Sequence, residues 1–169
     1  AKKNALQKLG VTYTMKGDYR INTTDEFFFK PEMFKTAKSG IQQNATLSTN
    51  MKVFKFFTLS PNANYKEVWY FDKISKTYDV AENEIVTDTI SGFNAFREYS
   101  GGVSLSTTLY GMVNFKKGRL QAIRHVLRPT VSYGYRPDFS SYYEDVQRSA
   151  DPTDVISYSQ FDNGIYGKP

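Results

Sequence analysis

The stretch RHVLRPTVSYGYRPDF, residues 124–139, is the part of the sequence that decides the fold. Its side chains alternate with a period of two, which is the period of a β-strand and not of a helix. The apolar phase contains Leu127, Val131, Tyr133 and Tyr135. The polar phase contains Arg124, Arg128, Thr130, Ser132 and Arg136. The stretch therefore predicts a strand with one apolar face and one cationic, polar face.

Composition points to strands along the rest of the chain. The 169 residues are 40% hydrophobic and include 13 Tyr and 13 Phe, residues that are enriched in strands. No stretch approaches the ~18 consecutive apolar residues of a membrane helix. This excludes a membrane protein built from helices, but not one built from strands, whose hydrophobicity is hidden by alternation. The net charge of +5 is scattered and forms no dense basic patch, so no nucleic-acid partner is expected.

The sequence shows no group of residues typical of a catalytic or metal-binding site. It contains no cysteine, which excludes a disulfide framework and a thiolate metal site within these residues. Its single histidine, His125, has no second histidine or cysteine with which to bind a metal. The acidic residues fall mostly in expected loops, with no pair on one face for acid–base work. We therefore expect no enzyme activity, no catalytic residues, no metal and no cofactor.

Other parts of the chain repeat the alternation. Residues 9–23 also alternate, and no apolar residue breaks their polar phase. The run is far longer than the ~5–6 residues of a soluble strand and long enough for the ~9–11 of a membrane strand. Further strands are expected in four places, the last of them weaker: 41–53, 57–66, 97–115 and 156–161. Long loops are expected at 24–40, 68–96 and 140–154, the second partly built as a projecting hairpin. Short turns are expected at 54–56 and 116–118.

Connections that alternate between long and short are typical of outer-membrane barrels, which have short periplasmic turns and long external loops. Aromatic residues near the strand ends are typical of the two interfacial girdles of such barrels. About six strands can hardly close a barrel with a lumen, because the smallest have ~8. The fold class predicted is therefore all-β: an antiparallel transmembrane β-barrel segment of about six strands. Residues 1–169 would form one partial outer-membrane barrel domain within a longer chain.

Two alternatives remain on pattern alone. A soluble β-sandwich binding module also has alternating strands, and its apolar phase would face a second sheet. Strand length and loop asymmetry favour the barrel over the sandwich. Another outer-membrane barrel, such as a TonB-dependent receptor or a porin, would show the same alternation.

The opening stretch also carries a set of spaced residues: His125, Leu127, Pro129, Tyr133, Tyr135, Pro137 and Asp138. This set resembles the barrel of the LptD (OstA) family of outer-membrane lipopolysaccharide assembly proteins, in which His-x-Leu-x-Pro leads through tyrosines to a proline and an acidic residue. The final YSQFDNGIYGKP is similar to the segment after the family's next external loop. FNAFREYS and LYGMVNFKKG resemble the Bacteroidetes branch. Arg128 is a departure, because proteobacterial relatives tend to carry an acidic residue there; the absence of cysteines is another.

The resemblance implies a transport function in the outer membrane of a Gram-negative bacterium. Lipopolysaccharide would arrive from a periplasmic Lpt bridge, its polar part would pass through the lumen, and its acyl chains would leave sideways through a seam into outer-membrane lipid. An LptE-type lipoprotein plug would occupy the lumen. Arg124, Arg128 and Arg136 are the candidate lumen contacts, because guanidinium pairs with phosphate in a fork. The same arginines could equally pair with carboxylates of neighbouring strands or of the plug.

Overall fold

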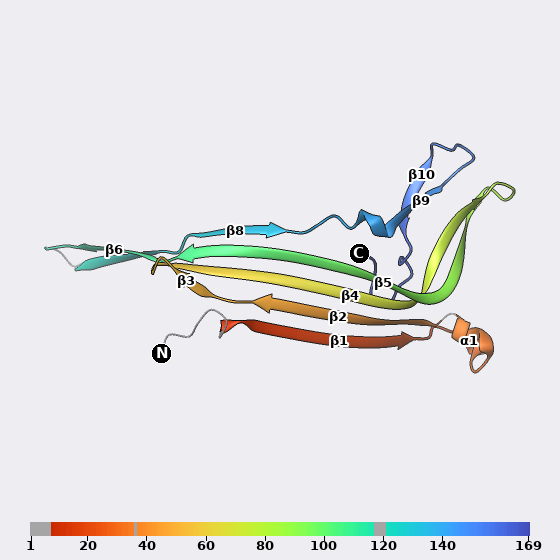
Figure 1. Ribbon diagram of the computed structural model, residues 1–169, viewed down its shortest axis with the longest axis horizontal. Helices are drawn as coiled ribbons and strands as arrows, with labels where there is room; N and C mark the ends of the chain where they lie inside the picture. The colour runs from red at the N-terminus through yellow and green to blue at the C-terminus, as the bar shows by residue number, and fades with distance from the viewer. Residues whose placement is uncertain (1–7, 36, 117–120) are drawn as a thin grey trace. The chain divides into compact units, whose positions relative to one another are not determined.

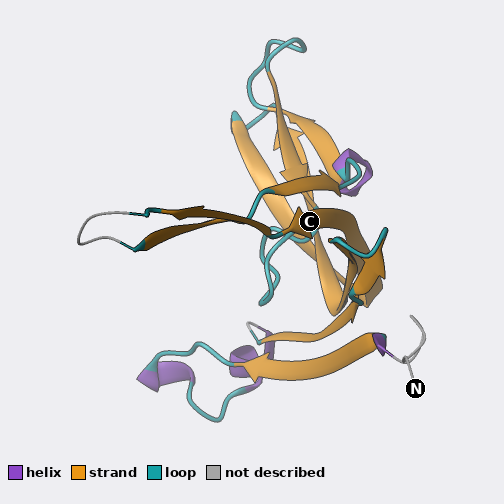
Figure 2. Ribbon diagram, turned by 90° about the vertical axis from the view of Figure 1, so that its left-hand side faces the viewer, coloured by secondary structure: helices purple, strands orange, loops and turns teal. Residues whose placement is uncertain are grey.

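The computed structural model describes residues 8–35, 37–116 and 121–169, and most of these residues lie in antiparallel strands (Figures 1 and 2). Strands account for 65% of the structure. Three short helical elements lie within the described residues: η2 (Asp25–Phe27), α1 (Pro31–Lys35) and η3 (Ser140–Tyr142). The predicted all-β, antiparallel class is confirmed. Among the described residues, no helix has the length and apolar character needed to cross a membrane.

The largest sheet has six strands in the order β1-β2-β4-β5-β8, with β3 paired to β4. Its strands are β1 (Gly10–Arg20), β2 (Lys38–Ser48), β3 (Met51–Val53), β4 (Phe57–Asp79), β5 (Glu84–Thr107) and β8 (Thr130–Tyr135). Two smaller sheets pair β6 (Leu109–Asn114) with β7 (Ala122–Leu127), and β9 (Tyr143–Gln147) with β10 (Val155–Ser159).

The chain divides into two units, and each is described here by itself. Unit 1 is built from Thr46–Asn64 and Ser100–Arg136 together with the start of β1. Unit 2 is built from Tyr13–Ala45, Tyr65–Tyr99 and Pro137–Pro169. The strands β1, β2, β4 and β5 each contribute residues to both units.

The short turn predicted at residues 54–56 is confirmed in unit 1. Val53 pairs with Phe57, so the three residues between them connect β3 to β4. Phe54 and Lys55 have φ values of 48° and 65°, in the left-handed region, and the amide of Phe56 donates to the carbonyl of Phe54 at 2.8 Å. The hydroxyl of Thr107 on β5 donates to the carbonyl of Phe56 at 2.8 Å and holds the turn beside the sheet. The second predicted turn, 116–118, includes residues 117 and 118, which lie outside the described residues.

The strands predicted at 97–115 and 124–139 pair with each other in one continuous register. On one side of the interruption, Ser106 pairs with Thr130; on the other side, Leu109 pairs with Leu127. No residue is inserted between these pairs, so Thr108 falls opposite Arg128 and the two phases continue unchanged. The structure nevertheless separates β5 from β6 and β7 from β8 at this point. The strand predicted at 97–115 is therefore divided between β5 and β6, and the stretch at 124–139 forms two strands, β7 and β8, instead of one.

Proline explains the interruptions. Because proline has no N–H, it can accept a ladder hydrogen bond but cannot return one. The carbonyl of Pro129 accepts from the amide of Thr107 at 3.2 Å, and the carbonyl of Pro61 accepts from the amide of Thr49, also at 3.2 Å. In each case the strand is interrupted next to this hydrogen bond: residues 128–129 and residues 49–50 are not in strand conformation.

The register sorts the side chains of β5 and β8 onto two faces. Leu105 pairs with Val131 and Val103 with Tyr133, whereas the intervening pairs are Ser104 with Ser132 and Ser106 with Thr130. Directly opposed residues of an antiparallel pair share a face. One face of this ladder is therefore apolar and the other polar, as the alternation predicts. The apolar face is open: Val131 is 73% exposed and Tyr133 69% exposed within the described residues.

The prediction of a loop at 68–96 is wrong apart from its projecting hairpin. β4 and β5 run through it as strands of 23 and 24 residues, joined by a turn at 80–83. The error has a physical cause. Val68 and Tyr70 are buried on one face, while Trp69 and Phe71 lie in the opposite phase, so apolar residues occupy both phases and the alternation disappears.

Two other loop predictions need correction. The segment 24–40 contains η2 and α1, and β2 already begins at Lys38. The segment 140–154 contains η3 and β9, and β9 pairs with β10 from Val155↔Gln147 to Ser159↔Tyr143. The strand predicted at 156–161 thus exists as β10, but it does not join the large sheet.

Candidate functional site

The residues of the predicted motif lie along the β7–β8 stretch and just after it. His125 and Leu127 are in β7, Pro129 is at the interruption, and Tyr133 and Tyr135 are in β8. All five are exposed. His125 pairs with Gly111 and belongs to the same phase as Leu127, so it lies on the apolar face of the β6–β7 hairpin.

The end of the motif starts the segment that follows β8. Pro137 is half-buried and Asp138 is exposed. The Asp138 carboxylate accepts from the hydroxyl of Ser140 at 2.7 Å and from its amide at 3.0 Å. These two hydrogen bonds hold the pKa of Asp138 below its usual range. Asp138 thus fixes the first turn, η3, of the segment after the strand.

The three candidate arginines lie on three successive segments. Arg124 is in β7, with its guanidinium carbon 4.8 Å from the centre of the Tyr110 ring. This contact is a cation–π interaction. Met112, the cross-strand neighbour of Arg124, also lies on this face, so the cationic phase is not uniformly polar. Arg128 lies at the interruption, and Arg136 directly follows β8.

Arg136 borders a shallow hollow in unit 1. The hollow has a volume of about 590 Å³, and its lining includes Asn62, Ser104, Ser132 and Arg136. The floor is flat because Gly102 pairs with Gly134. A Cβ at Gly102 would lie 3.2 Å from Oδ1 of Asn62. Hydroxyls, an amide and one guanidinium line this surface together with Val103, Tyr133 and Tyr135, so the hollow is mixed polar and apolar.

Unit 2 contains a second feature, which the sequence did not predict. Its last ten residues, 160–169, are here named the strap. Phe161 of the strap is 5% exposed and forms a hydrophobic cluster with Val68, Tyr70 and Phe96 of β4 and β5. Ile165 and Tyr166 of the strap pack against the same cluster. The strap is therefore fixed to the sheet by burial of apolar side chains.

Tyr70 is the residue around which the strap closes. It is 1% exposed, and its hydroxyl accepts from the amide of Tyr166 at 2.9 Å and donates to the carbonyl of Gly167 at 2.8 Å. Both hydrogen bonds satisfy strap backbone groups that a buried segment could not leave unpaired without cost. A Cβ at Gly164 would lie 2.3 Å from Cζ of Tyr70, and one at Gly40 would lie 3.0 Å from the ring. Only glycine leaves enough space at Gly164.

Ion pairs surround this cluster. Lys66 and Glu98 pair at 2.9 Å across β4 and β5. Asp162 of the strap faces two lysines: Lys168 at 2.9 Å and Lys76 of β4 at 3.6 Å. The Lys168 pair is half-exposed and contributes little by itself, whereas the partly buried pair with Lys76 ties the strap to the strand.

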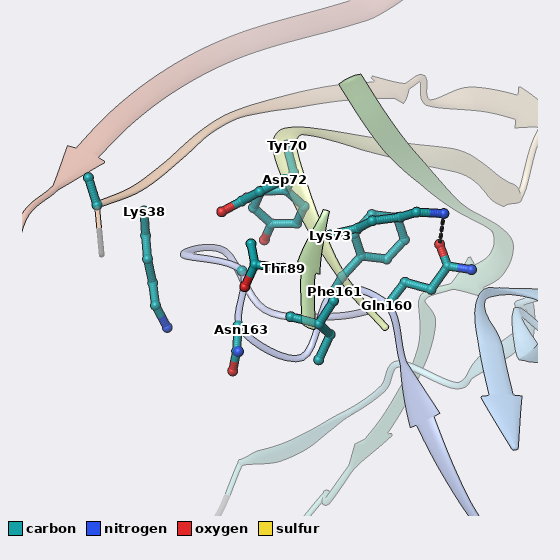
Figure 3. Close-up of a pocket in the computed structure, with 11 residues that line it drawn as sticks. Lys38, Tyr70, Asp72, Lys73, Thr89, Gln160, Phe161 and Asn163 are labelled. Carbon is teal, nitrogen blue, oxygen red and sulfur yellow. Dashed lines mark hydrogen bonds between the residues drawn. The ribbon is translucent and has the colours of Figure 1, made fainter. Parts of the chain in front are cut away.

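A cavity of about 280 Å³ lies beside the strap. Figure 3 shows Tyr70 and Phe161 next to each other, with Lys38, Asp72 and Asn163 arranged around them. Lys73 donates to Oε1 of Gln160 at 3.4 Å. Within residues 8–35, 37–116 and 121–169, no group of three or more His, Cys, Asp or Glu side chains could hold a metal ion. The cavity is a mixed polar and apolar recess.

A signal for the strap is present in the sequence. The polar phase of β4 contains Ser60, Asn62, Asn64 and Lys66, and then changes to Val68 and Tyr70. Apolar residues that interrupt a polar phase indicate that something covers that face. The segment that covers it is far along the chain and could not be identified from the pattern.

Comparisons with known proteins place the chain in a family. A family model described as LptD protein matches residues 1–169. No curated protein and no solved structure matches the chain. The LptD family is associated with the outer membrane of Gram-negative bacteria and is a transport and assembly family, not an enzyme family. Because the match covers every residue, the resemblance to the LptD family is confirmed: the chain belongs to this family and has a role in lipopolysaccharide transport and assembly.

Proposed function

We propose that residues 1–169 form part of an outer-membrane β-barrel, within a longer chain, that inserts lipopolysaccharide into the outer leaflet. The observation that carries this proposal is the sorting of faces in the β5–β8 ladder. Leu105 and Val131 share an open apolar face, while Ser104 and Ser132 share the polar face. An apolar face left open among the described residues fits contact with lipid, and a polar face fits a wet lumen.

Transport would be non-enzymatic. The polar part of lipopolysaccharide would travel along the polar face, and its acyl chains would leave through a seam between strands. The phosphates of lipopolysaccharide are natural partners for guanidinium groups. Among the three candidate arginines, Arg124 is engaged with Tyr110, and Arg136 borders the hollow. Arg128 has no side-chain partner among the described residues, so it is the arginine best placed to bind a transient ligand.

The proposed partners follow from the family. They are lipopolysaccharide, outer-membrane lipid, a lipoprotein plug of the LptE type and a periplasmic Lpt bridge. The Bacteroidetes-type assignment rests on FNAFREYS and LYGMVNFKKG and belongs to the same proposal. Neither the sequence nor the described residues offer an observation that favours a receptor, a porin or a soluble binding module over this function.

The direct test is depletion of the full-length protein in its own bacterium. Surface lipopolysaccharide would be measured on intact cells with an impermeant antibody, and total lipopolysaccharide in lysates. Depletion should lower the surface signal while the total persists, because synthesis continues when delivery stops. A matched strain that carries a second, undepleted copy should keep its surface signal. If depletion leaves the surface signal unchanged, the protein does not deliver lipopolysaccharide.

A further inference from the structure

The strap contacts four neighbouring strands in unit 2. The hydroxyl of Tyr166 donates to the carbonyl of Lys16 on β1 at 3.1 Å. A Cβ at Gly40 on β2 would lie 3.2 Å from Cγ2 of Ile165. On β4 the strap holds the Tyr70 hydroxyl, and on β5 the ring of Phe96 lies 5.1 Å from that of Phe161. These contacts follow the sheet order β1-β2-β4-β5.

All of these contacts are made on the polar-phase face of the strands. Tyr70 shares its phase with Lys66, Asn64 and Asn62, and Gly40 shares its phase with Gln42 and Asn44. Side chains two positions apart point to the same side of a strand. If the polar face lines the lumen, as the proposed function requires, the strap lies inside the barrel.

Burial beneath the strap is complete enough to exclude water. Val68 and Phe96 are 0% exposed and Tyr70 is 1% exposed, although Lys66 precedes Val68 and Glu98 follows Phe96 in the same phase of their strands. The strap is also locked in place, because the ring of Tyr70 fills the space that a side chain at Gly164 would need. Asp162 adds its two lysine contacts, to Lys76 and Lys168. A segment that is interlocked, hydrogen-bonded and ion-paired is a fixed structure.

We propose that the strap is a built-in seal, which closes the lumen beside β1, β2, β4 and β5 against small solutes. The inference rests on the proposed function, because it takes the polar face as the lumen wall. A fixed seal at these strands is compatible with the proposed transport, since the acyl chains leave sideways through a seam between strands. The seal comes from this chain itself and needs no plug protein at this part of the lumen.

The test uses the full-length protein with its natural partners, purified and reconstituted into liposomes. Uptake of a small neutral sugar is measured for the parent and for Tyr70→Ala, which removes the ring that Gly164 and Gly40 enclose. The matched control is Tyr99→Ala, because Tyr99 is 54% exposed and its hydroxyl has no described partner. Tyr70→Ala should raise sugar uptake several-fold, and Tyr99→Ala should leave it at the parent level. If Tyr70→Ala assembles and stays as impermeable as the parent, the strap is not a seal.

A second measurement does not depend on any variant. In the parent complex, the amide of Tyr166 should exchange slowly with deuterium, because it is bonded to a buried hydroxyl. Rapid exchange throughout residues 160–169 would overturn the seal even if Tyr70→Ala fails to assemble. Surface lipopolysaccharide, measured in the same strains, separates this proposal from the proposed function. If Tyr70→Ala delivers lipopolysaccharide normally and is no more permeable than the parent, only the proposal of a seal is wrong. If delivery stays normal after the protein is depleted, both the seal and the proposed function are wrong.

Discussion

Tyr70 and Gly164 interlock: a Cβ at Gly164 would lie 2.3 Å from Cζ and 2.4 Å from the hydroxyl oxygen of Tyr70. The ring cannot move away freely, because Gly40 is close to its other edge and Phe161 packs against it with ring centroids 5.6 Å apart. The strap can therefore lie on the sheet only because Gly164 has no side chain.

The first prediction follows from this contact. Gly164→Ala should destabilise the full-length barrel by ~1–3 kcal/mol, the usual cost of forcing extra volume into a packed site. The measurement is the urea midpoint of the reconstituted protein. Gly17→Ala is the matched control, because a Cβ there would lie 3.8 Å from Ile41, in ordinary contact. Equal midpoints for the two variants would show that the strap is not packed on Tyr70.

The second prediction concerns the faces of the β5–β8 ladder. Leu105→Arg or Val131→Arg should cost ~2–4 kcal/mol if these positions lie near the bilayer midplane, because a charge would then face lipid. Ser104→Arg or Ser132→Arg should be nearly neutral, because these side chains would meet water. The loss of folded protein in a urea titration measures both. Similar penalties on the two faces would contradict the membrane barrel and support a soluble sandwich.

The third prediction concerns topology. Glu84→Cys and Ser141→Cys in the full-length protein should react with an impermeant thiol reagent on whole cells, while Lys55→Cys should react only after the outer membrane is opened. All three positions are exposed, so burial cannot explain a difference in labelling. Lys55 lies in the turn between β3 and β4, and Glu84 begins β5 at the opposite end of β4. If only Lys55→Cys were labelled on intact cells, the turn between β3 and β4 would lie outside the cell, and the predicted orientation would be reversed.

Local pattern predicted part of this molecule correctly. The apolar and polar faces at residues 101–106 and 130–135 can be predicted, because the alternation within each strand shows which side chains share the apolar side. The turn at 54–56 follows from the break between two alternating runs. In contrast, the pattern at residues 68–96 wrongly predicts a loop, because Val68 and Trp69 are both apolar and conceal the period of two.

The strap could not be predicted for a different reason. Its central hydrogen bond joins Tyr166 to Tyr70, which are 96 positions apart. A contact between such distant residues does not change the alternation of side chains in either segment. Its only sign in the sequence is a pair of apolar residues, Val68 and Tyr70, in the phase that contains Asn64 and Lys66. For the candidate arginines, the sequence gives their common phase. It does not show that Arg124 is held by Tyr110, because Tyr110 lies in the partner strand of the hairpin.

The last prediction concerns Arg128, which lies opposite Thr108 where the strands are interrupted by Pro129. Its side chain has no described partner, so its charge is available to a phosphate. Arg128→Glu should reduce surface lipopolysaccharide while assembly stays normal, and Arg128→Lys should be intermediate, because lysine keeps the charge but cannot form the two parallel hydrogen bonds of guanidinium. Surface signal on intact cells measures delivery, and heat-dependent migration in detergent gels measures assembly. Arg148→Glu is the control, since it makes the same charge change in the segment between β9 and β10. Normal delivery in Arg128→Glu would remove this arginine from the transport route, and failed assembly would assign it to the structure of the barrel.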